Sequence, residues 1–455
     1  MRDLLVFGLV MLTLPLSFRR PFIGLLMFSW LAYMRPQDLC WGFARTMRLS
    51  FFVGMTMVVG WWANERGRRP FARWDSRCIS FVVLTAVVLL SYGLAKYHTE
   101  YFNRYMVEFI KIMVVALFTT GQVDTRQRFR IMIWTISICL AFYGVKGGLF
   151  GVLTGGATIL RGPGGMMEDN NDFALALAMN IPLLWYLGNS EEKIPLVKQG
   201  TRAAIFLTVV TILLTHSRGG FLSLVGAMVW IAWRSRKLFQ ACLALALCVV
   251  MFFSFAPQSV LDRLGTIGDT SESSINARLT AWSIAMRMVE DNPVFGVGLR
   301  NFQPRYLDYA MVAPDARVTT YVAHNSYFQI WAENGSLAFL IYMGLLASVF
   351  ITCRRVYRMG RVRPDMRWAM DYARMMEATT VAFMIGAFFL NRGHFDLIYH
   401  WLALVTCLAT VAYAAWRASP QQAIKQKAGV KMRRRPVIAT SGGQIKPQPR
   451  WGRTT

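Results

Sequence analysis

Three polar clusters interrupt an otherwise apolar sequence, and they hold the residue types that a group-transfer reaction needs. The first is Thr215-His216-Ser217-Arg218-Gly219-Gly220, the second contains Arg278 and Trp282, and the third is Ala323-His324-Asn325-Ser326-Tyr327, followed by Glu333. Two arginines can neutralise a diphosphate, because guanidinium groups suit bidentate phosphate binding. A neutral histidine can take a proton from an attacking hydroxyl group. Fixed arginines can also stabilise a diphosphate as it leaves.

Each cluster also has a structural interpretation. Arg218 could snorkel to the membrane interface, and Arg278 could be a surface arginine stacked on Trp282, one helical turn away. A lone histidine is more often structural than catalytic. Glu333 falls within an apolar run, so it needs a partner or a wet cavity. The chemical interpretation requires His324 to lie close to Arg218 in space, and this proximity is the main structural prediction.

The elements that must position these clusters are long apolar runs. The chain has 455 residues, of which 55% are hydrophobic and 16% charged, so it is too apolar for a soluble core. A helix that crosses a bilayer needs roughly 20 apolar residues. Runs of about this length or shorter lie near 3–18, 21–34, 48–63, 78–95, 105–121, 129–148, 172–187, 202–216, 220–233, 238–255, 326–352, 376–391 and 396–416. They predict an all-α polytopic integral membrane protein with about 12 or 13 transmembrane helices.

The distribution of charge predicts the topology. The net charge of +26 lies mostly in short loops between apolar runs, which argues against a nucleic-acid partner. The basic segments 64–77, 234–237, 353–374 and the tail after Trp416 fall on one side when the spans alternate, and this side is predicted to be the cytoplasm. The long hydrophilic stretch 256–323 then forms a periplasmic loop.

The periplasmic loop is predicted to be partly helical. Residues 276–290 have apolar residues at helical spacing, Asn292-Pro293 ends that helix, and Gly296-Val297-Gly298 makes a turn. The helix could lie on the membrane surface over a cavity or pack on the transmembrane bundle, and both interpretations stay open.

The sequence gives no sign of a metal or cofactor. Its seven cysteines contain no CxxC pair, no DxD motif is present, and the acidic residues are scattered. A metal-independent reaction without a cofactor is therefore the simpler hypothesis.

The run from His216 to Gly335 resembles the O-antigen ligase domain shared by lipopolysaccharide ligases, O-antigen polymerases and protein O-oligosaccharyltransferases. The matching pieces are Ser217-Arg218-Gly219, Arg278 with Trp282, Gly296–Phe302, His324–Tyr327 and Glu333-Asn334-Gly335. The segments 14–21, 33–36 and 162–171 are similar to O-glycosylation ligases associated with exosortase A systems. The resemblances divide the chain into an N-terminal transmembrane bundle (1–200), a ligase-type domain that includes the periplasmic loop (201–416), and a basic, disordered cytoplasmic tail (417–455).

The resemblance implies a glycan ligase whose donor is an undecaprenyl diphosphate-linked glycan. It implies that Arg218 and Arg278 bind the diphosphate and that His324 is the general base, with inversion at the anomeric carbon. The acceptor could be a lipid A core or a protein hydroxyl group. The protein is expected in the bacterial inner membrane among membrane lipids, with its active site facing the periplasm.

Further candidates share a predicted position beside this cavity. They are His216, Ser217, Gly219, Trp282, Asn325, Tyr327, Glu333, Asn170, Asn171, Arg392 and His394. His216 and His394 could compete with His324 for the role of base, and Asn170 and Asn171 could instead cap a helix. His98 and His400 are interpreted as structural.

Two other functions remain open at this stage. A polymerase that joins repeat units on the same carrier would use the same residues. A transporter or flippase would use the arginine cavity without chemistry, but no convincing internal repeat is present, and the clusters gather at one membrane face.

Overall fold

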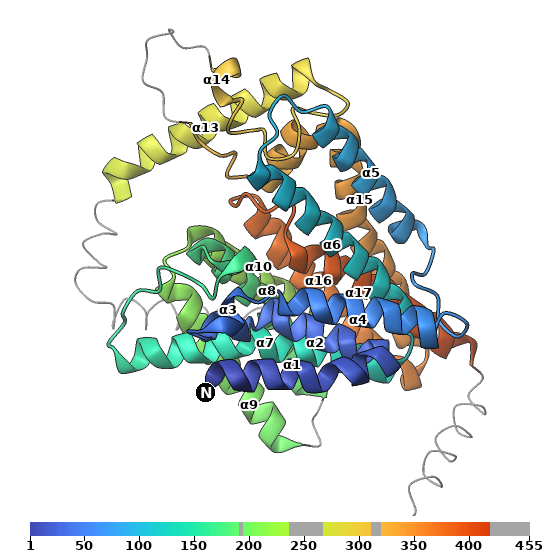
Figure 1. The fold of residues 1–455 in the computed structure, drawn as a ribbon. Coiled ribbons are helices and arrows are strands. Elements are labelled where there is room, and N and C mark those ends of the chain that lie inside the picture. Colours follow the sequence, from blue (N-terminus) through green and yellow to red (C-terminus); the bar gives the residue numbers. More distant parts are fainter. Residues whose placement is uncertain (191–193, 236–266, 311–319, 419–455) are drawn as a thin grey trace, which may run out of the picture. The chain divides into compact units, whose positions relative to one another are not determined.

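The computed structural model describes residues 1–190, 194–235, 267–310 and 320–418. These residues form α-helices joined by turns and loops, and no β-strand occurs among them (Figure 1). In chain order the helices are α1 (Arg2–Arg19), α2 (Pro21–Tyr33), α3 (Phe43–Thr46), α4 (Leu49–Asn64), α5 (Ser76–Gly93), α6 (Glu100–Gln122), α7 (Arg126–Leu153), α8 (Asn170–Ser190), α9 (Pro195–Leu214), α10 (Arg218–Ser235), α13 (Ile267–Asp291), α14 (Tyr306–Tyr309), α15 (Ser326–Val362), α16 (Arg367–Ala387) and α17 (Asp396–Arg417).

Among the described helices, 7 are long and apolar enough to cross a membrane, namely α5, α6, α7, α8, α9, α15 and α17. The helices α2 and α4 are apolar but shorter. The prediction of an all-α polytopic membrane protein is confirmed. The run 238–255 and the tail from 419 onward lie outside the described residues, and the total of about 12 or 13 spans stays a prediction.

Helix α8 lies at the centre of the part of the bundle that carries the first polar cluster. It packs against α9, α10 and α16, and nearly every residue from Asp172 to Gly188 is buried. Small side chains allow the close approach. A Cβ on Gly220 of α10 would lie 2.3 Å from the Cβ of Ala174, so only glycine fits there. The start of α10 is therefore held directly against the start of α8.

Helix α15 is broken at Gly335, which has φ 80° and ψ 176°. A break leaves backbone groups without helical partners, and the loop after α13 supplies them. Val297 N–H donates to the Ala332 carbonyl (2.9 Å), and Ser336 N–H donates to the Pro293 carbonyl (2.8 Å). The sequence predicts one uninterrupted apolar run over 326–352, so the break in the helix was not predicted. Its cause is the hydrogen bonding with the loop after α13.

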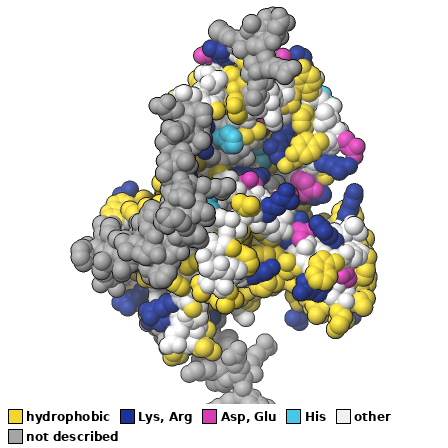
Figure 2. Space-filling view, turned by 90° about the vertical axis from the view of Figure 1, so that its left-hand side faces the viewer, with side chains coloured by type: hydrophobic (Ala, Val, Ile, Leu, Met, Phe, Trp, Pro, Cys, Tyr) yellow, Lys and Arg dark blue, Asp and Glu magenta, His cyan; other side chains and the backbone are white. Residues whose placement is uncertain are grey.

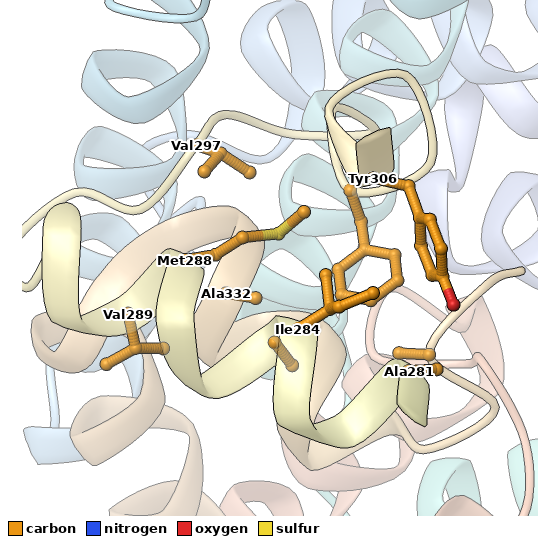
Figure 3. Packing of buried hydrophobic residues seen from close by; sticks show 10 residues of the cluster. Ala281, Ile284, Met288, Val289, Val297, Tyr306 and Ala332 are labelled. Carbon is orange, nitrogen blue, oxygen red and sulfur yellow. The ribbon is translucent and has the colours of Figure 1, made fainter. Parts of the chain in front are cut away.

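Helix α13 confirms the helix predicted at 276–290, and it ends at Asp291 directly before Asn292-Pro293. Its apolar side is buried against α15 and the loop that follows it. Figure 3 shows Ile284 and Met288 of α13 pointing toward Tyr306 and Val297. Of the two interpretations of this helix, packing on the bundle is therefore the one that the structure supports.

Candidate functional site

The first polar cluster forms the tight turn between α9 and α10. His216 takes the left-handed conformation (φ 52°), and the Ser217 hydroxyl oxygen accepts a hydrogen bond from Gly220 N–H (3.0 Å). From α8, the Asn170 side-chain amide donates to the Thr215 carbonyl (2.8 Å). Arg218 is thereby fixed as the first residue of α10, with an exposed side chain. A helix N-terminus carries partial positive charge, so this end of α10 favours an anion.

The third cluster forms the start of α15. His324 is left-handed (φ 46°) and its side chain is exposed. The next residue, Asn325, caps the helix, because its side-chain oxygen accepts hydrogen bonds from Tyr327 N–H (2.9 Å) and Phe328 N–H (3.2 Å). His324 therefore occupies a fixed bend between a buried alanine, Ala323, and a helix cap.

The second cluster joins α13 to this bend. The Trp282 indole N–H donates to the Ala323 carbonyl (2.9 Å), and its ring stacks on Phe328 with centroids 5.4 Å apart. Trp282 also packs edge-on against Phe388 (5.4 Å). Arg278 lies one turn before Trp282 on the same helix and is half-buried. The two residues of the predicted pair therefore differ in what they contribute. Trp282 contacts the bend before α15, and Arg278 supplies positive charge.

Electrostatic effects connect Arg278 with each of the other two clusters, while the proximity of His324 to Arg218 stays a prediction. Reduced hydration lowers the pKa of His324, and the positive charge of Arg278 lowers it further, while Asp169 acts in the opposite direction. The pKa of Arg278 is lowered by burial and by the charge of Arg218. Because such effects fall off with distance, Arg278 lies near both Arg218 and His324. A lowered pKa leaves His324 neutral near pH 7, as a base must be.

Two further candidates, Arg392 and Glu333, have polar partners on α8 and α15. Arg392 forms an ion pair with the buried Asp172 of α8, and its backbone N–H donates to the Ser326 hydroxyl (2.8 Å). The Gln329 side chain donates to Glu333 (3.3 Å), which is 2% exposed. The described surroundings of Glu333 thus supply the partner that the sequence required.

His394 also contacts α15. Its ring bonds to the Asn334 side-chain oxygen (3.1 Å) and meets Phe109 edge-on (5.2 Å). Burial lowers the pKa of His394 to about 3, and the charge of Arg300 lowers it further. Its described contacts are with Asn334 and Phe109 rather than with Arg218 or Arg278, which makes it a weaker candidate for the base than His324.

The other candidates have identifiable contacts. The Tyr327 hydroxyl donates to the Met384 carbonyl (2.7 Å), and the Asn171 amide donates to Asp169 (3.0 Å). His216 is exposed beside Arg218, and Gly219 packs against the side chain of Phe389. The His98 ring bonds to the Tyr92 carbonyl, and the His400 ring bonds to the hydroxyl groups of Tyr33 and Thr119. These contacts are consistent with a structural role for both histidines.

Three charged residues near the site were not assigned a role from sequence. Asp169 acts on His324, Asp172 pairs with Arg392, and Arg300 acts on both Asp172 and His394. Arg300 also lies over the Tyr105 ring, 3.6 Å from its centroid. Arg300 lies within the Gly296–Phe302 motif and Asp169 within the segment 162–171, and these were the available signals for them. Asp172 lies outside every matching segment, and the packing of α8 brings it here.

Comparison with known proteins agrees with this geometry. Residues 203–343 match the family model of the O-antigen ligases, and this range contains Arg218, Arg278 and His324. This part of the chain is thus an O-antigen ligase-type domain. Residues 1–191 match a family of unknown function, so the resemblance of this part to exosortase-associated ligases stays a prediction. No curated protein matches the chain. The O-antigen ligase domain thus spans α9, α10, α13 and the first half of α15.

Proposed function

We propose that this protein transfers a glycan from an undecaprenyl diphosphate carrier to an acceptor hydroxyl group at the periplasmic face of the inner membrane. The match of residues 203–343 to the O-antigen ligase model supports glycan transfer of the ligase or polymerase type. The observation that carries the residue assignment is the position of Arg278, whose charge acts on His324 and which itself feels the charge of Arg218. Two adjacent cations match a diphosphate, and a neutral imidazole beside them matches a general base.

In the proposed step, Arg218 and Arg278 bind the diphosphate of the donor. The acceptor oxygen attacks the anomeric carbon as His324 removes its proton, and the bond from that carbon to the phosphate oxygen breaks. The lipid diphosphate leaves with the electron pair, and the arginines stabilise its charge. One displacement inverts the anomeric configuration. His324 then returns the proton to water.

The step uses only side chains of this protein. Within the described ranges, no group of three or more His, Cys, Asp or Glu side chains is arranged to hold a metal ion. The positive charge that a leaving diphosphate needs is present as Arg218, Arg278 and the N-terminus of α10.

The test is transfer by the His324→Ala protein in liposomes. Wild-type protein is expected to transfer glycan from a polyprenyl diphosphate donor, with or without EDTA, and H324A is expected to lose this transfer while inserting normally into the membrane. Full activity of H324A would remove His324 from the mechanism. A donor consumed only to lengthen the lipid-linked glycan would identify a polymerase, and export of the intact donor would identify a flippase.

A further inference from the structure

A large groove lies mainly in the N-terminal part of the chain, and its lining residues are all outside the matched ligase range. It has a volume of about 1450 Å³ and is lined by α2, α4, α6, the loop 160–169 and the start of α17. Pockets for small molecules usually measure about 300–1,000 Å³, so this groove has room for a larger ligand. Figure 2 shows basic and acidic side chains gathered on one face of the molecule.

One wall of the groove is apolar and open to the surroundings of the helices. Phe51 and Met55 of α4 line it, and each is 51% exposed. Val107 and Val114 of α6 also line it, at 49% and 37% exposed. In a membrane protein, exposed apolar side chains on apolar helices face hydrocarbon. The groove therefore opens sideways toward lipid chains.

The same groove carries ionic side chains along α6. Glu108 pairs with Lys111 (2.6 Å), and Glu100 pairs with Arg104, all within a candidate membrane span. Charged residues in a span are costly in contact with hydrocarbon, and they usually face a cavity or a ligand. A ligand that contacts both walls must combine hydrocarbon with polar groups.

The lining of the groove is connected to the bend that carries the proposed base, because Arg392 lines the groove and its backbone N–H donates to the hydroxyl of Ser326 (2.8 Å), two residues after His324. Asp169 and Arg392 line the groove, and Asp169 is the acid whose charge acts on the His324 ring. Arg218 and Arg278 are not among the lining residues. The groove thus approaches His324 from the side of Asp169, whereas the arginines proposed for the diphosphate are the pair on α10 and α13.

We propose that this groove binds the acceptor, and that the acceptor is an amphiphile held in the membrane by its own hydrocarbon chains. This inference rests on the proposed function, because it takes Arg218 and Arg278 as the donor site. The chains lie against α4, the polar part lies along α6, and the hydroxyl group reaches His324 past Asp169. The N-terminal region of unknown function thereby receives a role in acceptor binding.

The first test measures occupancy without requiring transfer. A lipid A-core glycolipid with a diazirine in its acyl chain is photolysed with wild-type protein in liposomes, and labelled peptides are mapped by mass spectrometry. Labelling of α4 and α6 that unlabelled glycolipid suppresses, and that undecaprenyl diphosphate-linked glycan leaves unchanged, is the expected result. Labelling elsewhere, or suppression by the diphosphate lipid, overturns the proposal.

The second test fills the groove. Gly54 lines it, and a Cβ there would meet only the Phe28 ring at an ordinary 3.7 Å, so Gly54→Phe projects a ring into the cavity with little strain on the helix. Gly8→Phe is the matched control, because a Cβ at Gly8 meets nothing within 4 Å and Gly8 lies outside the groove.

G54F is expected to raise the KM for the glycolipid acceptor at least tenfold and to leave the KM for the donor unchanged, whereas G8F changes neither. A rise confined to the donor KM, or equal kinetics for G54F and G8F, overturns the proposal. If wild-type protein transfers glycan to a protein acceptor but not to the glycolipid, this proposal is overturned and the proposed function stands. If it transfers glycan to neither acceptor, the proposed function has failed, and the photolabelling pattern still decides whether the groove binds the amphiphile.

Discussion

The indole N–H of Trp282 donates a hydrogen bond to the carbonyl of Ala323, 2.9 Å away and one residue before His324. Through this bond α13, which carries Arg278, is connected to the bend that carries the proposed base. The relative positions of Arg278 and His324 therefore depend in part on this partly buried side-chain-to-backbone contact.

Replacement of Trp282 by Phe should lower kcat roughly 3- to 10-fold, since one hydrogen bond worth about 0.5–1.5 kcal/mol is lost while stacking on Phe328 is kept. Steady-state transfer assays in liposomes measure this. Trp331→Phe is the control, because its indole N–H bonds to Ser336 (2.9 Å) at the helix break rather than at the bend. Equal losses in both variants would mean that Trp282 acts only on stability.

The pH dependence of transfer should report His324. The pKa of His324 is lowered by reduced hydration and by Arg278, so the neutral base persists below its usual pKa of 6.5. The acidic limb of transfer, where the ring becomes protonated, should therefore lie below pH 6.5. The measurement is kcat/KM against pH for wild-type protein.

Two variants should move this acidic limb in opposite directions. Arg278→Ala removes a repulsive charge, so the pKa of His324 rises and the limb moves to higher pH. Asp169→Asn removes an attractive charge, so the pKa of His324 falls and the limb moves to lower pH. Arg278→Lys keeps the charge and should keep the wild-type limb. Movement in the same direction for R278A and D169N would contradict the assignment.

Donor binding should depend on the guanidinium groups as well as on their charge. Arg218→Ala is expected to raise the KM for the diphosphate donor roughly 10- to 100-fold, because charge-assisted hydrogen bonds contribute about 1.5–3 kcal/mol. Arg218→Lys should recover part of this, since lysine retains the charge without the bidentate geometry. A monophosphate donor should discriminate less between R218A and wild-type protein; unchanged KM in R218A would exclude the diphosphate role.

The break in α15 should require glycine. A Cβ on residue 335 would lie 2.1 Å from the Val294 carbonyl oxygen. A residue other than glycine would also have to adopt φ 80° there. Gly335→Ala should therefore lower the thermal midpoint in detergent by several degrees, as expected for roughly 1–3 kcal/mol or more of strain. Gly344→Ala on the same helix meets nothing within 4 Å and should leave the midpoint unchanged or raise it slightly.

Loss of one residue of the Arg392–Asp172 ion pair should destabilise the protein, because the other residue is left buried without its partner. Arg392→Met leaves the Asp172 carboxylate buried alone, which typically costs about 3–5 kcal/mol. The double variant Arg392→Met with Asp172→Leu removes both charges and should regain much of the lost thermal midpoint. No recovery in the double variant would show that the pair is needed for more than charge balance.

The sequence predicts the helices well because lipid-facing segments must be continuously apolar, and each predicted run within the described residues coincides with a helix. It also predicts a shared site for Arg218, Arg278 and His324; the structure gives an effect of Arg278 on His324 and of Arg218 on Arg278, and the proximity of His324 to Arg218 stays a prediction. The break at Gly335 was missed, because apolarity continues across it and its cause lies in a loop about forty residues earlier. Asp169 and Arg300 were missed for the same reason: their influence on the histidines arises from packing between distant segments, which no local pattern records.

His400 of α17 bonds to the Tyr33 hydroxyl (2.8 Å) and to the Thr119 hydroxyl (3.2 Å), and both partners lie in the region that matches the family of unknown function. Arg77 of that region likewise donates to Ser348 (2.9 Å) and Thr406 (3.2 Å). These bonds are lost if either half is exchanged alone. A chimaera that grafts residues 1–191 of a related protein onto the rest of this chain would therefore have to bring the matching positions on α15 and α17 with it. Residues 1–191 and these two helices are thus expected to be inherited, and engineered, as a single piece.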